Sequence, residues 1–141
     1  MGTLIGGIIP ALLLGVFGVL QKAANNNGIG VGIYLVLSGM SITLIGVVVY
    51  LAFPDKAVSV RSALPTCSGA LLWAVSMVLI QLAISNYNVE ISKLIPLVNM
   101  NTLIAVLLGL YFFSEWNSMN LLTLGVGACC IVIGGILVTV S

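Results

Sequence analysis

Five long apolar runs constrain this chain more than any other feature of its sequence. They cover about Thr3–Leu20, Ile29–Phe53, Leu64–Ile84, Ile91–Phe113 and Leu121–Val140, and only short polar connections separate them. A helix of about 20 apolar residues crosses the roughly 30 Å hydrocarbon layer of a bilayer. The runs are continuous, whereas the strands of a membrane β-barrel alternate apolar and polar residues. We therefore predict an all-α membrane protein, a single domain of five transmembrane helices spanning residues 1–141.

The composition excludes a water-soluble globular domain. Of the residues, 61% are hydrophobic and 5% are charged, and the mean hydropathy is +1.31; soluble domains carry about 25% charged residues. No basic segment precedes the first run, because the first Lys is Lys22. We therefore expect that run to be a retained span, with a cleaved signal peptide as the alternative.

Few residues could support catalysis or metal binding. There is no His, and Cys67, Cys129 and Cys130 lie in or beside apolar runs, where we expect them to pack as small residues. Three scattered acids form no familiar metal-ligand pattern, and no Gly-rich phosphate loop is present. We expect no enzyme activity, no cofactor, no metal and no nucleic-acid partner.

The charges do not select one orientation in the membrane. With five spans, Lys56 and Arg61 fall on one side and Lys22 and Lys93 on the other. Because the difference in Lys and Arg between the two sides normally sets orientation, an equal number on each side predicts that both orientations occur.

A weak internal repeat appears when the chain is shifted by 59 residues. "ALLLGVFGVLQKAANN" (11–26) then aligns with "ALLWAVSMVLIQLAIS" (70–85), and "TLIGVVVYLAF" (43–53) aligns with "TLIAVLLGLYF" (102–112). Apolar sequences match one another easily, but the pattern indicates a repeated helix pair.

Three segments carry a resemblance to a known family. "ALLWAVSMVLIQLAIS", "LIPLVNMNTLIAVLLGLYFFSEW" and "LLTLGVGACCIVIGGILV" resemble the EamA-type repeat of the drug/metabolite transporter superfamily. The markers are the Ala-rich segment around Trp73, the Pro of "LIPLV", the Gly-to-Glu interval that ends at Glu115, and the Gly-rich last span. The resemblance covers nearly the whole chain, because one repeat of that family is a unit of five spans.

The resemblance implies a small-solute transporter. Most members carry two repeats in inverted orientation, which give ten spans around a central cavity, whereas this chain carries one. It therefore implies an antiparallel homodimer that resembles a ten-helix 5+5 transporter, works by alternating access and resides in a prokaryotic cytoplasmic (inner) membrane. The alternatives are a non-transporting membrane subunit and half of a heteromeric transporter, and an intramembrane enzyme ranks below both.

Polar residues inside the spans are the candidate solute contacts, since such groups usually face a protein interior or a wet cavity. For the hydroxyl groups the alternative is a bond back to their own helix, for Gln81 an interhelical hydrogen bond, and for Trp73 plain packing. The sparse fixed charge favours a neutral or weakly charged solute. The predicted substrate-binding residues are Gln21, Tyr34, Ser38, Trp73, Ser76, Gln81 and Asn99.

The stretch "EISKLIPLVNMNTL" (90–103) concentrates polar residues at the start of the fourth span. Pro96 has no N–H, so the Ser92 carbonyl loses its helical donor and the helix is predicted to bend there. Asn99, one turn further, is the better cavity candidate, while Asn101 is expected to bond a neighbouring helix. The alternative is an ordinary amphipathic start to a span.

The last span is rich in glycine. Gly127 and Gly134 lie seven residues apart, with Gly135 adjacent, and allow another helix to approach closely. We predict that Gly127 and Gly134 form the dimer contact. The alternative is packing within the same chain.

Overall fold

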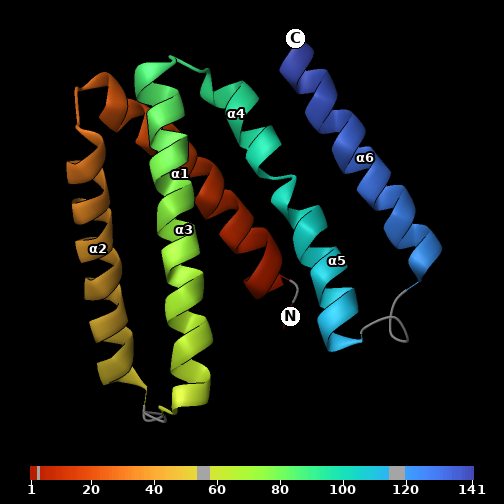
Figure 1. Ribbon diagram of the computed structural model, residues 1–141, viewed down its shortest axis with the longest axis horizontal. Helices are drawn as coiled ribbons and strands as arrows, with labels where there is room; N and C mark the ends of the chain where they lie inside the picture. The colour runs from red at the N-terminus through yellow and green to blue at the C-terminus, as the bar shows by residue number, and fades with distance from the viewer. Residues whose placement is uncertain (3, 54–57, 115–119) are drawn as a thin grey trace. The chain divides into compact units, whose positions relative to one another are not determined.

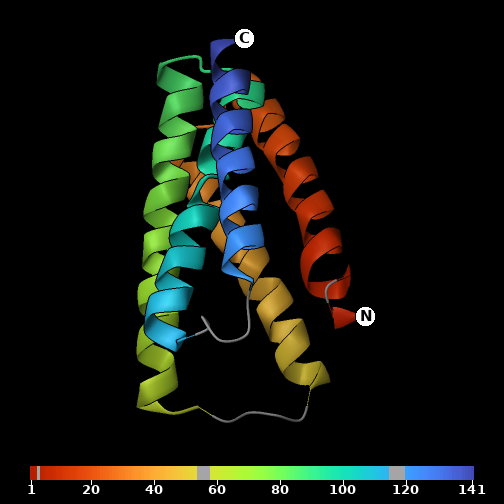
Figure 2. The same ribbon diagram turned by 90° about the vertical axis from the view of Figure 1, so that its right-hand side faces the viewer.

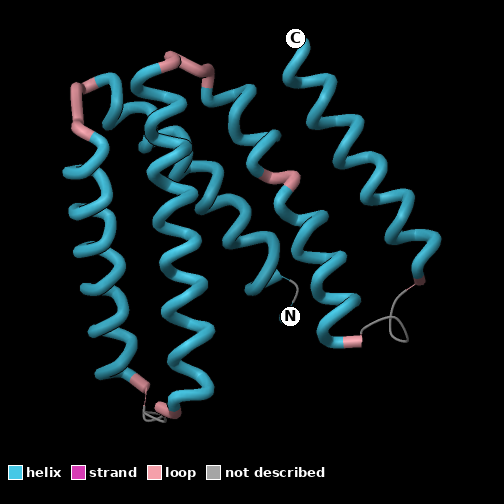
Figure 3. The backbone as a smooth tube through the Cα atoms, in the orientation of Figure 1, coloured by secondary structure: helices cyan, strands magenta, loops and turns pink. Residues whose placement is uncertain are grey.

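The computed structural model describes residues 1–2, 4–53, 58–114 and 120–141, and within them the chain is helical and contains no strand (Figures 1 and 3). Five helical segments are long and apolar enough to cross a membrane, which confirms the prediction of an all-helical protein with five such segments. They are Leu4–Asn26, Val31–Ala52, Val60–Asn86, Ile91–Phe113 and Leu121–Val140.

Some of the predictions concern residues outside the described part. Thr3, at the predicted start of the first span, is one of them, as are Lys56 in the charge comparison and Glu115 in the family resemblance. The chain divides into two compact units, Met1–Asn88 and Val89–Ser141.

The first unit consists of a π-helical turn, Leu4–Ile8, followed by α1 (Ile9–Asn26), α2 (Val31–Ala52) and α3 (Val60–Asn86). The helix α1 continues past the apolar run because its polar end still contains good helix formers. The chain leaves the helix after Asn26 and turns at Gly28, whose φ of +82° suits glycine and whose N–H donates to the Asn25 carbonyl at 2.9 Å.

The start of α3 also lies outside its apolar run. Ser59 caps the helix, because its Oγ accepts from the Ser62 N–H at 3.2 Å, and the Ser62 Oγ accepts from the Ser59 N–H at 3.1 Å. This reciprocal arrangement satisfies two N–H groups that a helix start leaves without partners. The cap explains why α3 begins at Val60 rather than at Leu64.

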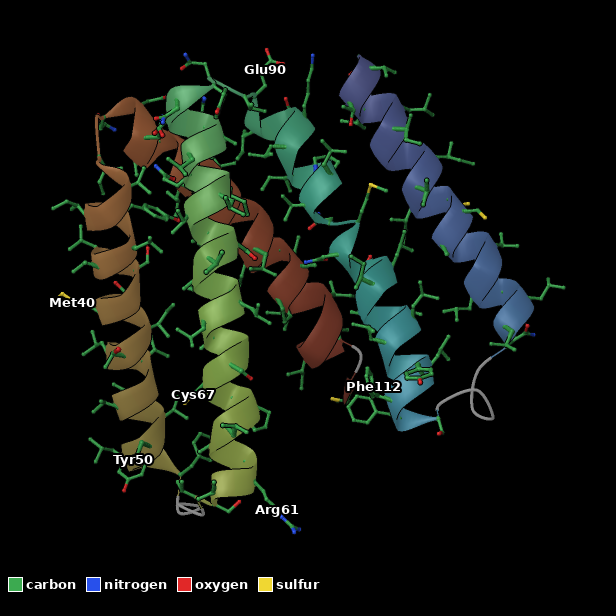
Figure 4. All side chains as sticks on the ribbon, viewed as in Figure 1. Met40, Tyr50, Arg61, Cys67, Glu90 and Phe112 are labelled. Carbon is green, nitrogen blue, oxygen red and sulfur yellow. The ribbon has the colours of Figure 1, made fainter. Side chains whose placement is uncertain are left out.

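The core of the first unit lies at one end of its helices, where α1 ends, α2 begins and α3 ends. In this unit α3 packs against both α1 and α2, and Figure 2 shows α2 and α3 diverging away from the core. Side chains such as Met40 point outward from α2 (Figure 4). The described residues buried in this core are Gly18, Gln21, Tyr34, Ile80, Gln81 and Ile84.

The second unit consists of α4 (Ile91–Val98), α5 (Asn101–Phe113) and α6 (Leu121–Val140). Together α4 and α5 form the fourth span, which is interrupted at Asn99 and Met100 (Figure 3). The last helix, α6, packs against α4. It starts at a cap in which Asn120 Oδ1 accepts from the N–H groups of Leu122 at 3.1 Å and Thr123 at 3.2 Å.

Candidate functional site

A chain of side-chain amides connects α1 to α3 in the core of the first unit. Gln21 Nε2 donates to Gln81 Oε1 at 3.2 Å, and Gln81 Nε2 donates to Asn25 Oδ1 at 3.3 Å. Gln21 is 2% exposed and Gln81 is 0% exposed. The structure thus brings together two of the predicted solute contacts and joins them by the interhelical hydrogen bond that was the alternative for Gln81.

Tyr34 lies in the same core, on the first turn of α2, and is 7% exposed. Its hydroxyl is buried and makes no hydrogen bond of good geometry within the part of the chain that the structure describes, but the Ser38 side chain lies beside it. A buried hydroxyl without a partner costs about 1–3 kcal/mol. Ser38 is therefore the group within the chain that can pair with the Tyr34 hydroxyl.

The hydroxyl groups of the spans mostly bond to their own helices. Ser76 Oγ donates to the Leu72 carbonyl at 2.9 Å, and Ser41 Oγ donates to the Leu37 carbonyl at 2.9 Å. Such bonds satisfy a hydroxyl group in an apolar environment without a ligand. Ser38 is half-buried, one turn after Tyr34.

Trp73 and Ser76 lie further along α3, outside the buried core. Trp73 is 42% exposed, and Ser76 is also exposed. Neither residue is enclosed within its own unit. Since Asn99 belongs to the other unit, a cavity shared by Asn99, Gln81 and Trp73 stays a prediction.

The interruption of the fourth span begins at Asn99, three residues after Pro96. The N–H of Asn99 donates to the Ile95 carbonyl at 2.9 Å and ends α4. The next bonds span three residues instead of four: Met100 N–H to Leu97 O at 3.1 Å and Thr102 N–H to Asn99 O at 3.2 Å. Asn99 and Met100 are the ninth and tenth of the 23 residues of this span, so the interruption is near its middle.

Glycine allows α6 to approach this interruption. A Cβ added to Gly135 would lie 3.5 Å from Met100 Sδ and 3.8 Å from the Pro96 carbonyl oxygen. By contrast, a Cβ on Gly127 or Gly134 would meet nothing within 4 Å. Gly135 therefore makes the contact within the chain, while Gly127 and Gly134 are exposed, and their predicted role in a dimer stays a prediction.

A pair of opposite charges lies at the start of α4. Lys93 Nζ lies 3.4 Å from Glu90 Oε2, three residues earlier, and Glu90 is exposed at the beginning of the helix (Figure 4). An exposed pair of this kind contributes about 0–1 kcal/mol. It therefore suits the edge of the membrane rather than a binding site.

An open groove between α5 and α6 was not predicted from the sequence. Its volume is about 460 Å³. Of its residues only Gly127 was singled out, because the others are ordinary apolar or hydroxyl residues that form a surface only once the helices are placed. The lining residues are Thr102, Leu103, Val106, Asn120, Thr123, Leu124, Gly127, Ala128 and Ile131.

Comparisons with known proteins identify no relative. No protein-family model, curated protein or solved structure matches the chain. Among the described residues, no group of three or more His, Cys, Asp or Glu side chains is placed to hold a metal ion. The candidate site therefore consists of the amide chain with Tyr34 in the first unit and the interrupted span in the second.

Proposed function

We propose that this chain is one half of a membrane transporter for a small neutral or weakly charged solute. The observation that carries the proposal is the interrupted fourth span, with Pro96 before the interruption and Asn99 within it. Asn99 and Met100 keep right-handed helical dihedral angles, but the hydrogen bonds here span three residues, so the helix is tightened rather than unwound. A short stretch of this kind within a helix often marks a functional hinge, and many transporters form their solute sites where a helix is broken near the middle of the bilayer.

The interruption provides both polar groups and a place to move. Pro96 leaves the Ser92 carbonyl without its helical donor, and the Asn99 side chain is exposed. An amide can both donate to and accept from an uncharged solute. Because α6 contacts the interruption at Gly135, a change in the angle between α4 and α5 alters the α4–α6 packing.

The working unit of the proposal is an antiparallel homodimer in the lipid bilayer. A single set of five spans cannot surround a solute, and an inverted second copy supplies the other wall in a common transporter plan. The equal numbers of Lys and Arg on the two sides permit both orientations. Gly134, which is exposed on α6, is the proposed contact between copies.

A non-transporting subunit, or one half of a heteromeric transporter, is the second candidate. The observation in its favour is that several polar side chains are satisfied within the chain. Gln21 and Gln81 bond each other, and Ser76 bonds its own helix. The bond between Gln21 and Gln81 stabilises helix packing, the bond of Ser76 satisfies a hydroxyl group within one helix, and neither needs a solute.

Transport by the purified chain alone separates these candidates. The protein is reconstituted into liposomes and tested for uptake and efflux of amino acids, sugars, polyamines and lipophilic cations, with protein-free liposomes as the control. The proposal expects saturable transport of at least one neutral solute. Absence of transport from all liposomes, or transport only after a second, different chain is added, contradicts the homodimer.

A further inference from the structure

The groove between α5 and α6 has a regular construction. Its α6 residues follow the spacing of one helix face, from Asn120 through Leu124, Gly127 and Ala128 to Ile131. At 1.5 Å per residue this face is about 16 Å long. The opposite wall is formed by Thr102, Leu103 and Val106 of α5.

Small residues give the groove its depth. Gly127 and Ala128 lie halfway along the α6 face, and a Cβ on Gly127 would meet nothing within 4 Å. The volume of about 460 Å³ falls within the range of about 300–1,000 Å³ that is usual for small-molecule sites. The groove therefore accommodates a compact ring-sized solute beside the helix backbone.

Polar groups in the groove are neutral and restricted to three side chains. Asn120 uses its Oδ1 to cap α6, which leaves the two N–H donors of its amide outside the cap. Thr102 Oγ1 donates to the Asn99 carbonyl at 2.9 Å, and its lone pairs are not used in that bond. Thr123 adds a second hydroxyl group.

The uncharged lining of the groove favours an uncharged ligand. None of the lining residues is charged, so an ion in the groove would lose water without gaining a counter-charge. A neutral solute with one or two hydrogen-bonding groups loses much less hydration free energy on entering the groove. An acyl chain alone would leave the amide donors of Asn120 unused.

We infer that this groove binds a neutral, mostly apolar solute that carries at least one hydrogen-bond acceptor. Its apolar part lies over Gly127 and Ala128, and its acceptor faces the amide donors of Asn120 and the hydroxyl group of Thr123. The identification of this ligand as the transported solute rests on the proposed function. It places the first binding step beside the interruption of the fourth span, because Thr102 both lines the groove and bonds Asn99.

Photolabelling of the protein in liposomes tests the inference. Benzophenone is the probe, since it is neutral, has two aromatic rings and one carbonyl acceptor, and inserts into nearby C–H bonds under ultraviolet light. Its anionic analogue 4-benzoylbenzoate is the charge control. Mass spectrometry of the digested protein maps the label. The expected result is saturable labelling within 102–106 and 120–131 by benzophenone, and at least about tenfold less by the anion.

Two matched variants locate the site. Gly127→Leu fills the groove and is expected to reduce groove labelling at least about tenfold. Gly46→Leu makes the same change on α2, outside the groove, and is expected to leave labelling unchanged. If both variants fold, as their circular dichroism spectra report, an unchanged label in Gly127→Leu overturns the inference. Thr123→Val is a smaller change that is also expected to weaken labelling, and it replaces Gly127→Leu as the test if that variant does not fold.

Other occupants give different results. Label spread evenly over the lipid-facing helices indicates a lipid-filled surface and overturns the inference. No groove label, together with a loss of dimer mass in Gly127→Leu, indicates a helix of a second copy and also overturns it. Saturable groove labelling without transport of any solute supports the binding site and contradicts only the proposed function, so the two can fail separately.

Discussion

The hydrogen bond between Gln21 and Gln81 makes a sharp prediction about stability. Gln81→Leu removes both bonds of the amide chain and leaves the Gln21 amide, 2% exposed, without its partner. Interhelical bonds in membrane proteins average about 0.6 kcal/mol and reach about 1.7. A buried amide left unpaired costs about 1–3 kcal/mol more. We therefore expect Gln81→Leu to lower the free energy of unfolding by about 2–4 kcal/mol.

A double-mutant cycle isolates the bond itself. Replacement of both partners by Leu removes the unpaired group, so Gln21→Leu with Gln81→Leu is expected to cost less than Gln81→Leu alone. Unfolding is followed by circular dichroism during titration with sodium dodecyl sulfate in mixed micelles. Ser76→Ala, which removes an exposed bond within one helix, is the control and is expected to change stability by less than about 0.5 kcal/mol.

Two results would refute this reasoning. The first is a Gln81→Leu variant that unfolds like the Ser76→Ala control. The second is a double variant whose loss equals the sum of the two single losses, since additivity means that the side chains do not interact. Either result would mean that the Gln81 amide contributes nothing to helix packing, as expected of a side chain that serves only as a solute contact.

Three further predictions concern the interrupted span and the orientation of the chain. Pro96→Ala restores a donor to the Ser92 carbonyl and is expected to change the rate of transport more than the half-saturating solute concentration. Initial rates in liposomes measure both quantities, and equal rates for the variant and the wild type would contradict a moving element at Pro96. Gly135→Ala is expected to raise the free energy of unfolding by up to about 1 kcal/mol, because Ala favours a helix more than Gly does, whereas Gly135→Leu displaces Met100 and is expected to lower it. The same detergent titration measures both variants, and equal effects would contradict a close contact at Gly135. Reporter fusions at the C-terminus are expected to signal from both sides of the membrane. Two Lys residues added to the connection 114–120 are expected to bias that side toward the cytoplasm. A single orientation of the unmodified chain contradicts the prediction.

The helices could be predicted from the sequence because each apolar run has only one stable form in a bilayer. Backbone groups in hydrocarbon must be satisfied internally, so Val31–Ala52 has no alternative to a helix. Helix ends were less predictable. The polar residues from Gln21 to Asn26 lower hydropathy without breaking the helix, and the cap at Ser59 depends on a bond to Ser62 that hydropathy does not report.

Side-chain partners were the least predictable part of the site. The sequence identifies Gln21 and Gln81 as costly polar groups within apolar runs, but not that the two amides meet, because this depends on how α1 rotates against α3. The same limit applies to glycine. Seven-residue spacing singles out Gly127 and Gly134, whereas the close approach occurs at Gly135, since the rotation of α6 on α4 selects which glycine faces the interruption.

The most direct test of the central claim compares two asparagines at the interruption. Asn99 is the proposed solute contact, and Asn101 is the same residue type two positions later, with an exposed side chain in both cases. The measurement is the initial rate of solute uptake by purified wild type, Asn99→Leu and Asn101→Leu in liposomes at equal protein content. We predict saturable uptake by the wild type and by Asn101→Leu, and at least about tenfold slower uptake by Asn99→Leu with unchanged unfolding. Equal uptake by Asn99→Leu and the wild type would contradict a solute site at the interrupted span.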